Sequence, residues 1–176
     1  MTPVVIAFGS NVGDREGQIR RALRKLESAV IVEAVSGLYE TAPMYDVDQP
    51  DFLNGIATGL TLLGPTGLVR ALKRIESEVG REAVRRNGPR EIDLDLVLYG
   101  QLILRSVGSF DVQVPHPRLH ERRFVLEPLY EVVPDAFVPG FGPVETLLEN
   151  PTVQAQSARR VADARVPLQG PERTRA

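Results

Sequence analysis

Asp93 and Asp95 are the residues of this chain whose type and spacing point most directly to chemistry. They alternate with apolar residues over 92–98, and this period of two predicts a strand with both carboxylates on one face and the apolar side chains on the other. At about 6 Å apart, two carboxylates repel each other by about 3 kcal/mol at an effective dielectric of about 20. Two interpretations follow: a solvated strand face, or a site where Mg²⁺ ions lie between the acids.

Arginines gather just before the acidic strand. Arg81 and Arg85 lie in a polar loop over 80–88, and the Gly88-Pro89 pair fixes the chain so that Arg90 stands at the start of the strand. The planar guanidinium suits phosphate, and carboxylate-held Mg²⁺ together with arginines is the combination that phosphoryl transfer requires. The alternative is a surface salt-bridge network among these arginines and the two aspartates.

Both histidines of the chain follow in one segment, as His116 and His120. This spacing could bind zinc on a helix, but Pro117 disrupts regular geometry there and the sequence shows no third ligand. A His116 that contacts phosphate and a His116 that only fixes its loop are the other two interpretations.

Several function classes do not fit the composition. The chain has no cysteine, which excludes disulfides, thiolate catalysis and cysteine-bound metals. It lacks the Gly-x-x-x-x-Gly-Lys-Ser/Thr loop and the protein-kinase signatures. A net charge of −2 argues against a general nucleic-acid binder. No apolar run reaches the roughly 20 residues that a membrane helix needs, and the first residues do not read as a signal peptide, so we expect a cytoplasmic protein without a membrane partner.

The elements that must position these residues follow from the hydrophobic pattern. Its order is βαββαβ, the ferredoxin-like split unit, so we expect an α+β fold with an added C-terminal hairpin and short helices. The hairpin is expected around Gly100-Gln101. The expected strands are 4–8, 31–39, 52–63 and 91–99, and the expected helices begin after Asp14 and at Pro65.

One domain over 1–150 accounts for the apolar residues, which make up 43% of a chain of 176 residues. From Asn150 onward the sequence turns polar and rich in Arg, Gln and Pro. We therefore expect 151–176 to be a mobile tail whose removal leaves activity nearly intact.

The run Arg86-Asn87-Gly88-Pro89-Arg90-Glu91-Ile92-Asp93-Leu94-Asp95-Leu96-Val97 closely resembles the signature of 6-hydroxymethyl-7,8-dihydropterin pyrophosphokinases. Four further segments resemble that family in the family's order and extend the likeness over residues 1 to about 149. They are 9–11, 39–43, 49–54 and 114–124.

The resemblance implies that ATP donates a diphosphate to the hydroxymethyl group of 6-hydroxymethyl-7,8-dihydropterin and that AMP leaves. Asp93 and Asp95 would bind two Mg²⁺ ions that bridge the ATP phosphates and the pterin oxygen, and Asp95 would help to take the hydroxyl proton. Arg81 and Arg90 would act with the acids. The triphosphate would be gripped by Arg81, Arg90, His116 and Arg122, with Arg85 closing over it.

For the pterin, the resemblance implies a slot between two aromatic rings with an amide that reads the ring edge. Phe52 and Phe124 match the stacking pair, and Asn54 matches the amide. The remaining pterin contacts would come from Gly9, Thr41, Ala42 and Met44. On residue type alone, Phe52 and Phe124 would instead be core residues. Glu76 matches a position near the site, but it is expected on the exposed side of the second helix, where a solvated face explains it equally well.

The chain departs from the family pattern in the arginine-rich loop. Asn87 stands where many members have tryptophan, and the loop is about one residue shorter than in some relatives, which leaves lid closure and the role of Arg85 open. Two rival functions are a ferredoxin-like nucleotide- or RNA-binding module and a catalytically inactive pterin binder. The first lacks an aromatic RNA-binding motif, and the second would be expected to have lost an aspartate or Arg90. We expect a monomer that uses small-molecule substrates and no nucleic acid.

Overall fold

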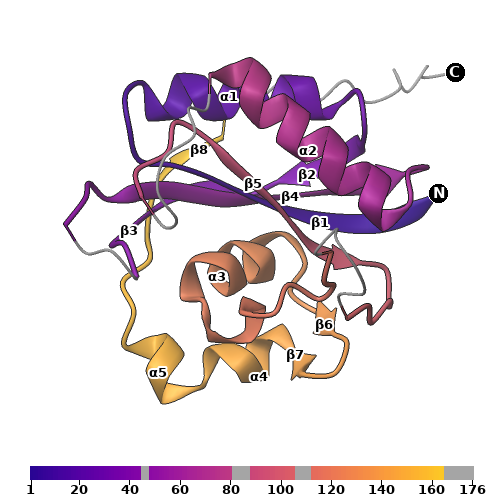
Figure 1. Ribbon diagram of the computed structural model, residues 1–176. Helices are drawn as coiled ribbons and strands as arrows, with labels where there is room; N and C mark the ends of the chain where they lie inside the picture. The colour runs from indigo at the N-terminus through magenta and orange to yellow at the C-terminus, as the bar shows by residue number, and fades with distance from the viewer. Residues whose placement is uncertain (45–47, 81–87, 106–111, 165–176) are drawn as a thin grey trace, which may run out of the picture.

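A computed structural model describes residues 1–44, 48–80, 88–105 and 112–164. An antiparallel sheet forms the middle layer, with two helices over one face and a smaller group of helices over the other (Figure 1). The upper helices are α1 (Arg15–Leu26) and α2 (Pro65–Val79). The lower layer contains η1 (Leu119–Glu121), α3 (Arg123–Val132), α4 (Val144–Leu148), α5 (Pro151–Gln154), and the small hairpin of β6 (Phe137–Val138) and β7 (Gly142–Pro143). The protein is thus a mixed α/β structure.

An inner strand of the sheet is β1 (Thr2–Ser10). It pairs on one side with β5 (Asp93–Tyr99) and on the other with β4 (Phe52–Thr61). β4 then pairs with both β2 (Ile31–Val35) and β3 (Gly37–Thr41), and β3 pairs with β8 (Arg159–Asp163). All of these pairings are antiparallel. The strand order β5-β1-β4-β3-β8 places β5 and β8 at opposite edges of the sheet.

The second expected strand, 31–39, is divided into β2 and β3. Val35 lies opposite Ala57 while Tyr39 lies opposite Asn54, so this segment holds one more residue than its partner over the same stretch. The break falls at Ser36, whose hydroxyl accepts a hydrogen bond from the Ile56 N–H (2.9 Å) and whose own N–H donates to the Ile56 carbonyl. A bulge of this kind re-aims the strand without leaving a polar group unpaired.

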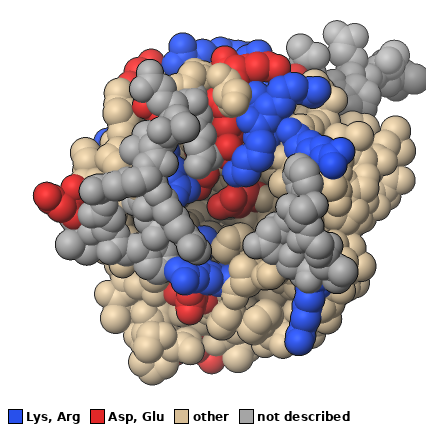
Figure 2. Space-filling model, in the orientation of Figure 1, with Lys and Arg blue, Asp and Glu red and all other residues tan. Residues whose placement is uncertain are grey.

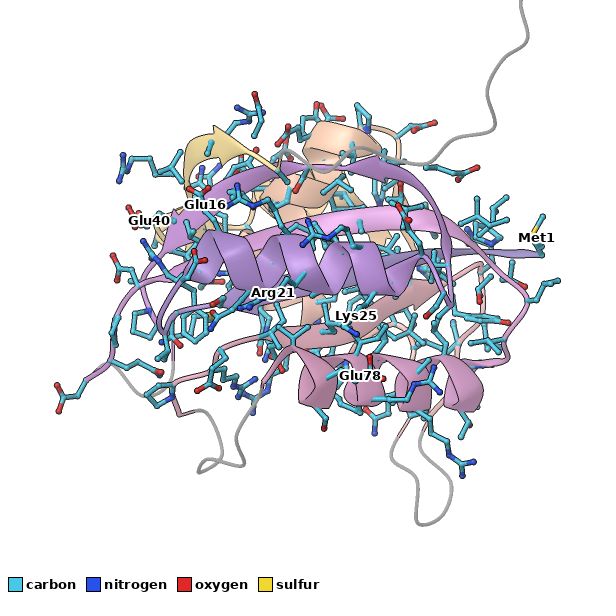
Figure 3. The ribbon with its side chains drawn as sticks, turned by 90° about the horizontal axis from the view of Figure 1, so that it is seen from above. Met1, Glu16, Arg21, Lys25, Glu40 and Glu78 are labelled. Carbon is cyan, nitrogen blue, oxygen red and sulfur yellow. The ribbon has the colours of Figure 1, made fainter. Side chains whose placement is uncertain are left out.

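Each face of the sheet packs its own apolar cluster. The cluster under α1 and α2 includes Leu68 and Leu72 from α2 and Leu94 from β5, each with no exposed surface. Asp14 begins α1 because its side chain accepts the Gly17 N–H. Between the two helices, Lys25 and Glu78 form an ion pair of 2.7 Å, seen from above in Figure 3.

The hairpin expected around Gly100-Gln101 is not formed by named strands. Gly100 makes a turn with a positive φ of 52°, and the segment after it contributes an isolated bridge between Leu104 and Val114. The two-stranded hairpin of the described residues is β6–β7 instead, in which Phe137 pairs with Pro143.

The segment expected to be a mobile tail from residue 151 contains α5 and β8 over 151–163, and 165–176 lie outside the described residues. α5 places Val153 in the core of the lower layer with no exposed surface. β8 then pairs with β3 across the sheet edge, although its side chains are mostly exposed. A polar segment can join a sheet edge in this way, because backbone hydrogen bonds need no apolar side chains. Within the described ranges, no helix has the length and apolar character to cross a membrane.

Candidate active site

One pocket opens on the lower face of the sheet, where β1, β3, β4 and β5 face η1 and α3. Figure 2 shows a hollow in this side of the molecule with acidic atoms inside it and Lys and Arg atoms around it. Every predicted site residue that the structure describes lines this pocket, whereas Arg81 and Arg85 lie outside the described residues. The predicted residues in the lining are Gly9, Thr41, Ala42, Met44, Phe52, Asn54, Arg90, Asp93, Asp95, His116, Arg122 and Phe124.

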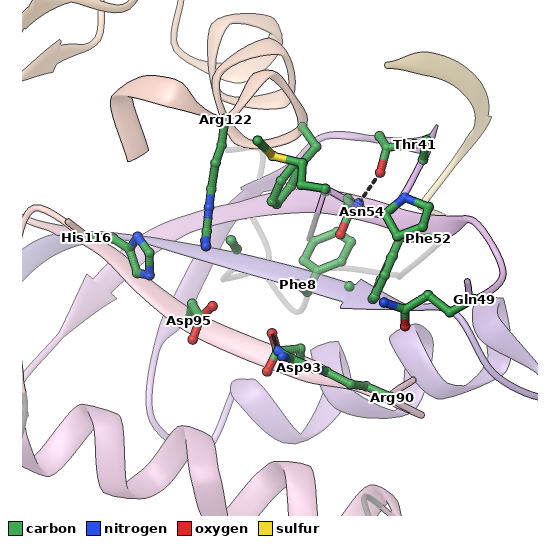
Figure 4. Close-up of a pocket in the computed structure, with 17 residues that line it drawn as sticks. Phe8, Thr41, Gln49, Phe52, Asn54, Arg90, Asp93, Asp95, His116 and Arg122 are labelled. Atoms are coloured by element: carbon green, nitrogen blue, oxygen red, sulfur yellow. Dashed lines mark hydrogen bonds and ion pairs between the residues drawn. The ribbon is translucent and has the colours of Figure 1, made fainter. Parts of the chain in front are cut away.

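The predicted acid pair occupies the β5 wall of the pocket (Figure 4). Leu94, between the acids, packs on the opposite face of the sheet, as the alternation predicted. Leu98 does not follow that alternation, because the pairing with β1 shifts by one residue between Leu96 and Leu98 and turns Leu98 to the lower cluster. The side chains of Asp93 and Asp95 keep 19% and 37% of their exposure, so both carboxylates reach the pocket without being fully solvated.

Like charge is concentrated on this wall. Burial and the neighbouring negative charge of Asp93 raise the pKa of Asp95, and the cations of Lys73, Arg122 and Arg90 counter that rise. Arg90 forms an ion pair with Asp93, which is part of the salt-bridge network that the alternative interpretation predicted. Asp95 lies 3.7 Å from Lys73, measured between Oδ1 and Nζ.

Asn11 connects the acidic wall to the opposite rim of the pocket. Its Oδ1 accepts the Arg90 N–H (2.8 Å), and its own N–H donates to the Arg90 carbonyl (3.0 Å). Its Nδ2 donates to Gln49 Oε1 (3.0 Å) and to the Pro50 carbonyl (2.9 Å). With only 2% of its surface exposed, Asn11 fixes Arg90 relative to the segment that leads into β4.

His116 faces the acids from the segment before η1. Burial first, and then the positive charge of Arg122, lower the pKa of His116 to about 4, so its ring is neutral at neutral pH. The Arg118 N–H donates to His116 Nδ1 (3.2 Å), which places the ring proton on Nε2. His120 does not join it, since its ring stacks on Phe141 with centroids 4.2 Å apart. The described residues contain no group of three or more His, Asp or Glu that could hold a metal.

The opposite end of the pocket combines aromatic side chains with a buried amide. Asn54, 7% exposed, donates from Nδ2 to Thr41 Oγ1 (2.7 Å), and this bond fixes the orientation of the amide in the wall. Gly9 lies directly against it, because a Cβ at Gly9 would come within 2.3 Å of Asn54 Oδ1. Phe52 lies two residues from Asn54 on β4, and Phe124 lines the pocket from α3, beneath the Arg122 guanidinium at 5.5 Å.

A second cavity adjoins the first at Asp95 and His116, which line both. Its remaining walls are largely apolar and come from α2, β5 and the segment before η1. They are Val69, Leu72, Lys73, Leu94, Leu96, Val112, Gln113 and Pro117.

Sequence reasoning did not single out several residues of the site, among them Phe8, Gln49 and Lys73, and it misplaced Glu76. Phe8 and Gln49 line the first pocket, and Lys73 lines the second. Glu76 is not on the exposed side of α2: 2% of its surface is exposed, and its Oε1 accepts the Leu94 N–H at 2.6 Å. The signal for Glu76 was its spacing, since it stands four residues after Leu72 on the buried stripe of the helix.

The sequence of this chain matches a known protein family. The family described as 7,8-dihydro-6-hydroxymethylpterin-pyrophosphokinase (HPPK) matches residues 5–134. The 2-amino-4-hydroxy-6-hydroxymethyldihydropteridine pyrophosphokinase of Aquifex aeolicus is 39% identical over 139 residues, which cover 79% of this chain and 85% of the relative. That of Bacillus subtilis is 43% identical over 129 residues, which cover 72% of this chain and 75% of the relative.

Other relatives are longer proteins. The mitochondrial folate synthesis bifunctional protein of Arabidopsis thaliana is 46% identical over 134 residues, which cover 76% of this chain but 24% of the relative. The chain thus spans about a quarter of the length of that protein. A crystal structure of Plasmodium falciparum HPPK-DHPS shares the fold with a TM-score of 0.67 at 14% identity, over 84% of this chain and 43% of that one.

Proposed function

The chain belongs to the 7,8-dihydro-6-hydroxymethylpterin-pyrophosphokinase family, and from this premise we propose that it transfers diphosphate from ATP to the hydroxymethyl group of 6-hydroxymethyl-7,8-dihydropterin in folate synthesis. One observation carries the proposal: the paired carboxylates of Asp93 and Asp95 share a pocket with the aromatic and amide side chains of Phe52, Asn54 and Phe124. A reacting oxygen of the bound heterocycle would therefore lie beside a site suited to a nucleotide's phosphates.

The acid pair fits divalent cations. Two partly buried carboxylates face the same cavity, and the negative charge of Asp93 already raises the pKa of Asp95. Mg²⁺ is commonly held by one or two carboxylates, with phosphate oxygens and water completing the octahedron, so two acids are a sufficient protein contribution. We propose that Asp93 and Asp95 hold two Mg²⁺ ions. When bound there, Mg²⁺ would neutralise phosphate charge and polarise the reacting phosphorus.

For the nucleotide, we propose that the base and ribose occupy the second cavity and that the phosphates cross toward the first past Asp95 and His116. The apolar lining of the second cavity suits a flat base, and its junction with the first lies beside the acids. The neutral ring of His116 would donate from Nε2 to a phosphate oxygen, and Arg90 and Arg122 would bind the remaining charge. Arg81, proposed to bind the triphosphate, and Arg85, proposed to close over it, lie outside the described residues.

For the pterin, we propose stacking between Phe52 and Phe124, with Asn54 hydrogen-bonding the ring edge. The bond from Asn54 to Thr41 supports this role, because a fixed amide loses no further freedom when it binds the ring. The remaining edge contacts are assigned to the lining groups of Gly9, Thr41, Ala42 and Met44.

The proposed reaction is an in-line displacement. The hydroxymethyl oxygen attacks the β-phosphorus of ATP, the bond from that phosphorus to the oxygen bridging the α- and β-phosphates breaks, and AMP leaves. The hydroxyl proton passes to the carboxylate of Asp95, which lies in the same pocket. Arg90 and Arg122 hold the phosphates in line, and such positioning supplies most of the catalysis in phosphoryl transfer.

The architecture supports one finer proposal about the fold. The order β1–α1–β2/β3–β4–α2–β5 and the sheet order β5-β1-β4-β3 are consistent with a ferredoxin-like βαββαβ unit whose second strand is divided.

The direct test mixes the protein with ATP, Mg²⁺ and 6-hydroxymethyl-7,8-dihydropterin and separates the nucleotide products. AMP and a diphosphorylated pterin in equal amounts are expected. ADP would identify an ordinary kinase, and pterin binding without either product would identify a non-catalytic pterin binder.

A further inference from the structure

β5 is an edge strand whose outer side is covered by side chains and loop backbone rather than by another strand. In the described sheet its strand neighbour is β1 alone. Leu94, between the two acids, donates its N–H to Glu76 Oε1 (2.6 Å), and its carbonyl accepts from Lys73 Nζ (3.1 Å). Further along the same strand, the Val97 carbonyl accepts the His116 N–H (2.9 Å). The peptide groups of Leu94 are therefore held from α2.

The ammonium of Lys73 stands between the acids as well as beside Leu94. Its Nζ lies 3.7 Å from Asp95 Oδ1 and 4.0 Å from Asp93 Oδ1, while a hydrogen bond of 2.8 Å ties it to Glu76 Oε1. The two longer distances are outside hydrogen-bond range, so Lys73 contributes its charge without occupying the acceptor sites of these carboxylate oxygens. Arg90, by contrast, pairs with Asp93 through Oδ2.

We propose that Lys73 is a positioning residue: a resident counter-charge that holds the carboxylates of Asp93 and Asp95 side by side when no divalent cation is bound. What the acid pair does rests on the proposed function, but the electrostatic role of Lys73 is a property of the protein alone. Without this charge, two neighbouring carboxylates on a partly buried wall would repel each other and either spread apart or bind a proton.

The charge of Lys73 supports this role. Its ammonium has three carboxylates within 4.0 Å, those of Asp95, Asp93 and Glu76. Glu76 is itself buried in α2. Its Oε1 accepts both the Leu94 N–H and a hydrogen bond from Lys73 Nζ, so it holds the lysine beside the strand. The lysine is thus fixed by its neighbours and does not need to reach the acids for its charge to act on them.

A double-mutant cycle on unfolding separates counter-charge from packing. Lys73→Met removes the charge at similar length, and Asp95→Asn removes the repulsion. Lys73→Met is expected to raise the unfolding equilibrium constant in urea about fivefold in the wild type. In the Asp95→Asn background, the factor by which Lys73→Met raises this constant is expected to be smaller by at least about threefold. The lost bonds to Leu94 and Glu76 are common to both backgrounds and cancel. Equal penalties in the two backgrounds would overturn the proposal, and Lys73→Gln serves in the same cycle if the methionine variant does not fold.

The second readout is the response to Mg²⁺ without nucleotide, against NaCl at matched ionic strength. Because the lysine and a divalent cation relieve the same repulsion, Mg²⁺ is expected to raise the melting temperature of Lys73→Met more than that of the wild type, with Lys73→Arg behaving like the wild type. Equal shifts in all three proteins would contradict the proposal. A protein that forms no AMP yet shows the coupling would refute the proposed function and leave the role of Lys73 intact.

Discussion

The two sides of the pocket lie toward opposite edges of one sheet and are held by different means. On the β5 side, which carries the acids, single side chains of α2 bind the strand edge: Lys73 and Glu76 fix Leu94 from a helix that ends shortly before the strand. On the β3 side, which carries Thr41 and faces Asn54, a whole strand, β8, covers the edge.

Ion pairs tie β8 to the rim of the pocket. Glu40, next to Thr41, accepts from Arg159 of β8 (2.6 Å) and from Arg15 of α1 (3.1 Å). Arg15 in turn donates to the carbonyl of Asp51 (2.8 Å), one residue before Phe52. β8, α1 and the segment before β4 are thus tied to β3 at the end of the pocket that we assign to the pterin.

A second connection lies deeper. Glu131 of α3 accepts the Gly37 N–H (3.1 Å), the Tyr39 hydroxyl (2.7 Å) and the Arg160 guanidinium (3.2 Å). These bonds outweigh burial and lower the pKa of Glu131, and burial together with this carboxylate raises the pKa of Tyr39. The comparison teaches that the outer edge of the acidic strand is held by a residue about twenty positions away, as between Lys73 and Leu94, whereas the edge of the recognition side is held by residues about 120 positions away, as between Glu40 and Arg159.

The largest expected effect would come from the acids. Asp93→Asn or Asp95→Asn should lower AMP formation by about a thousandfold or more, because each removes a charge that the proposed metal site requires. Circular dichroism should show the fold retained. Asp163→Asn, which changes an acid on the β8 edge, is the matched control and should keep activity within about twofold. Wild-type turnover in either pocket variant would refute the metal role.

The next effect tests recognition on the other side of the pocket. Phe124→Ala should weaken pterin binding by about 30-fold, measured by calorimetry, and change the affinity for an ATP analogue by less than about twofold. Phe137→Ala is the control, since that ring is 51% exposed on β6, outside the pocket lining. Equal losses for pterin and nucleotide would argue against stacking by Phe124.

A chain that ends at residue 158 removes β8 and tests whether the covered edge matters. We expect the free energy of unfolding to fall by about 2 kcal/mol, from lost strand pairing and ion pairs, and pterin affinity to fall several-fold more than ATP affinity. Urea unfolding and calorimetry measure these effects. Arg160→Met in the full chain keeps the pairing and should cost less than about 1 kcal/mol. Unchanged stability and binding after truncation would restore the original expectation of a dispensable tail.

The sequence revealed the parts of the site whose pattern is local. Asp93 and Asp95 were recognisable because alternation with apolar residues places both on one face. Phe52 and Asn54 were recognised through the family resemblance, and they stand two apart on a strand. The helix spacing also held the signal for Glu76, which was overlooked because a charged residue was expected at the surface.

What the sequence did not reveal depends on distant partners. β8 reads Arg-Arg-Val-Ala-Asp and lies on an edge with exposed side chains, so no hydrophobic period marks it as a strand. No sequence pattern indicates the bulge at Ser36 either, because the extra residue is visible only in the register against β4. Lys73 acts through a strand about twenty residues away, and nothing in its own helix indicates that contact.

The smallest expected effect concerns His116, which faces the acids of the β5 side and whose pKa is lowered by burial and by Arg122. Its pKa of about 4 in the folded protein lies below the ordinary value of 6.5, so folding favours the neutral ring. Stability from this group is fully present above pH 6.5 and is lost as the pH falls toward 4, because the unfolded chain takes up the proton first. The stability difference between the wild type and His116→Asn should therefore shrink by about 2 kcal/mol between pH 7.5 and pH 5, measured by urea unfolding at each pH. A stability difference that stays constant between the two pH values would show that folding does not lower the pKa of His116. Burial and the positive charge of Arg122 would then not act on the ring as described.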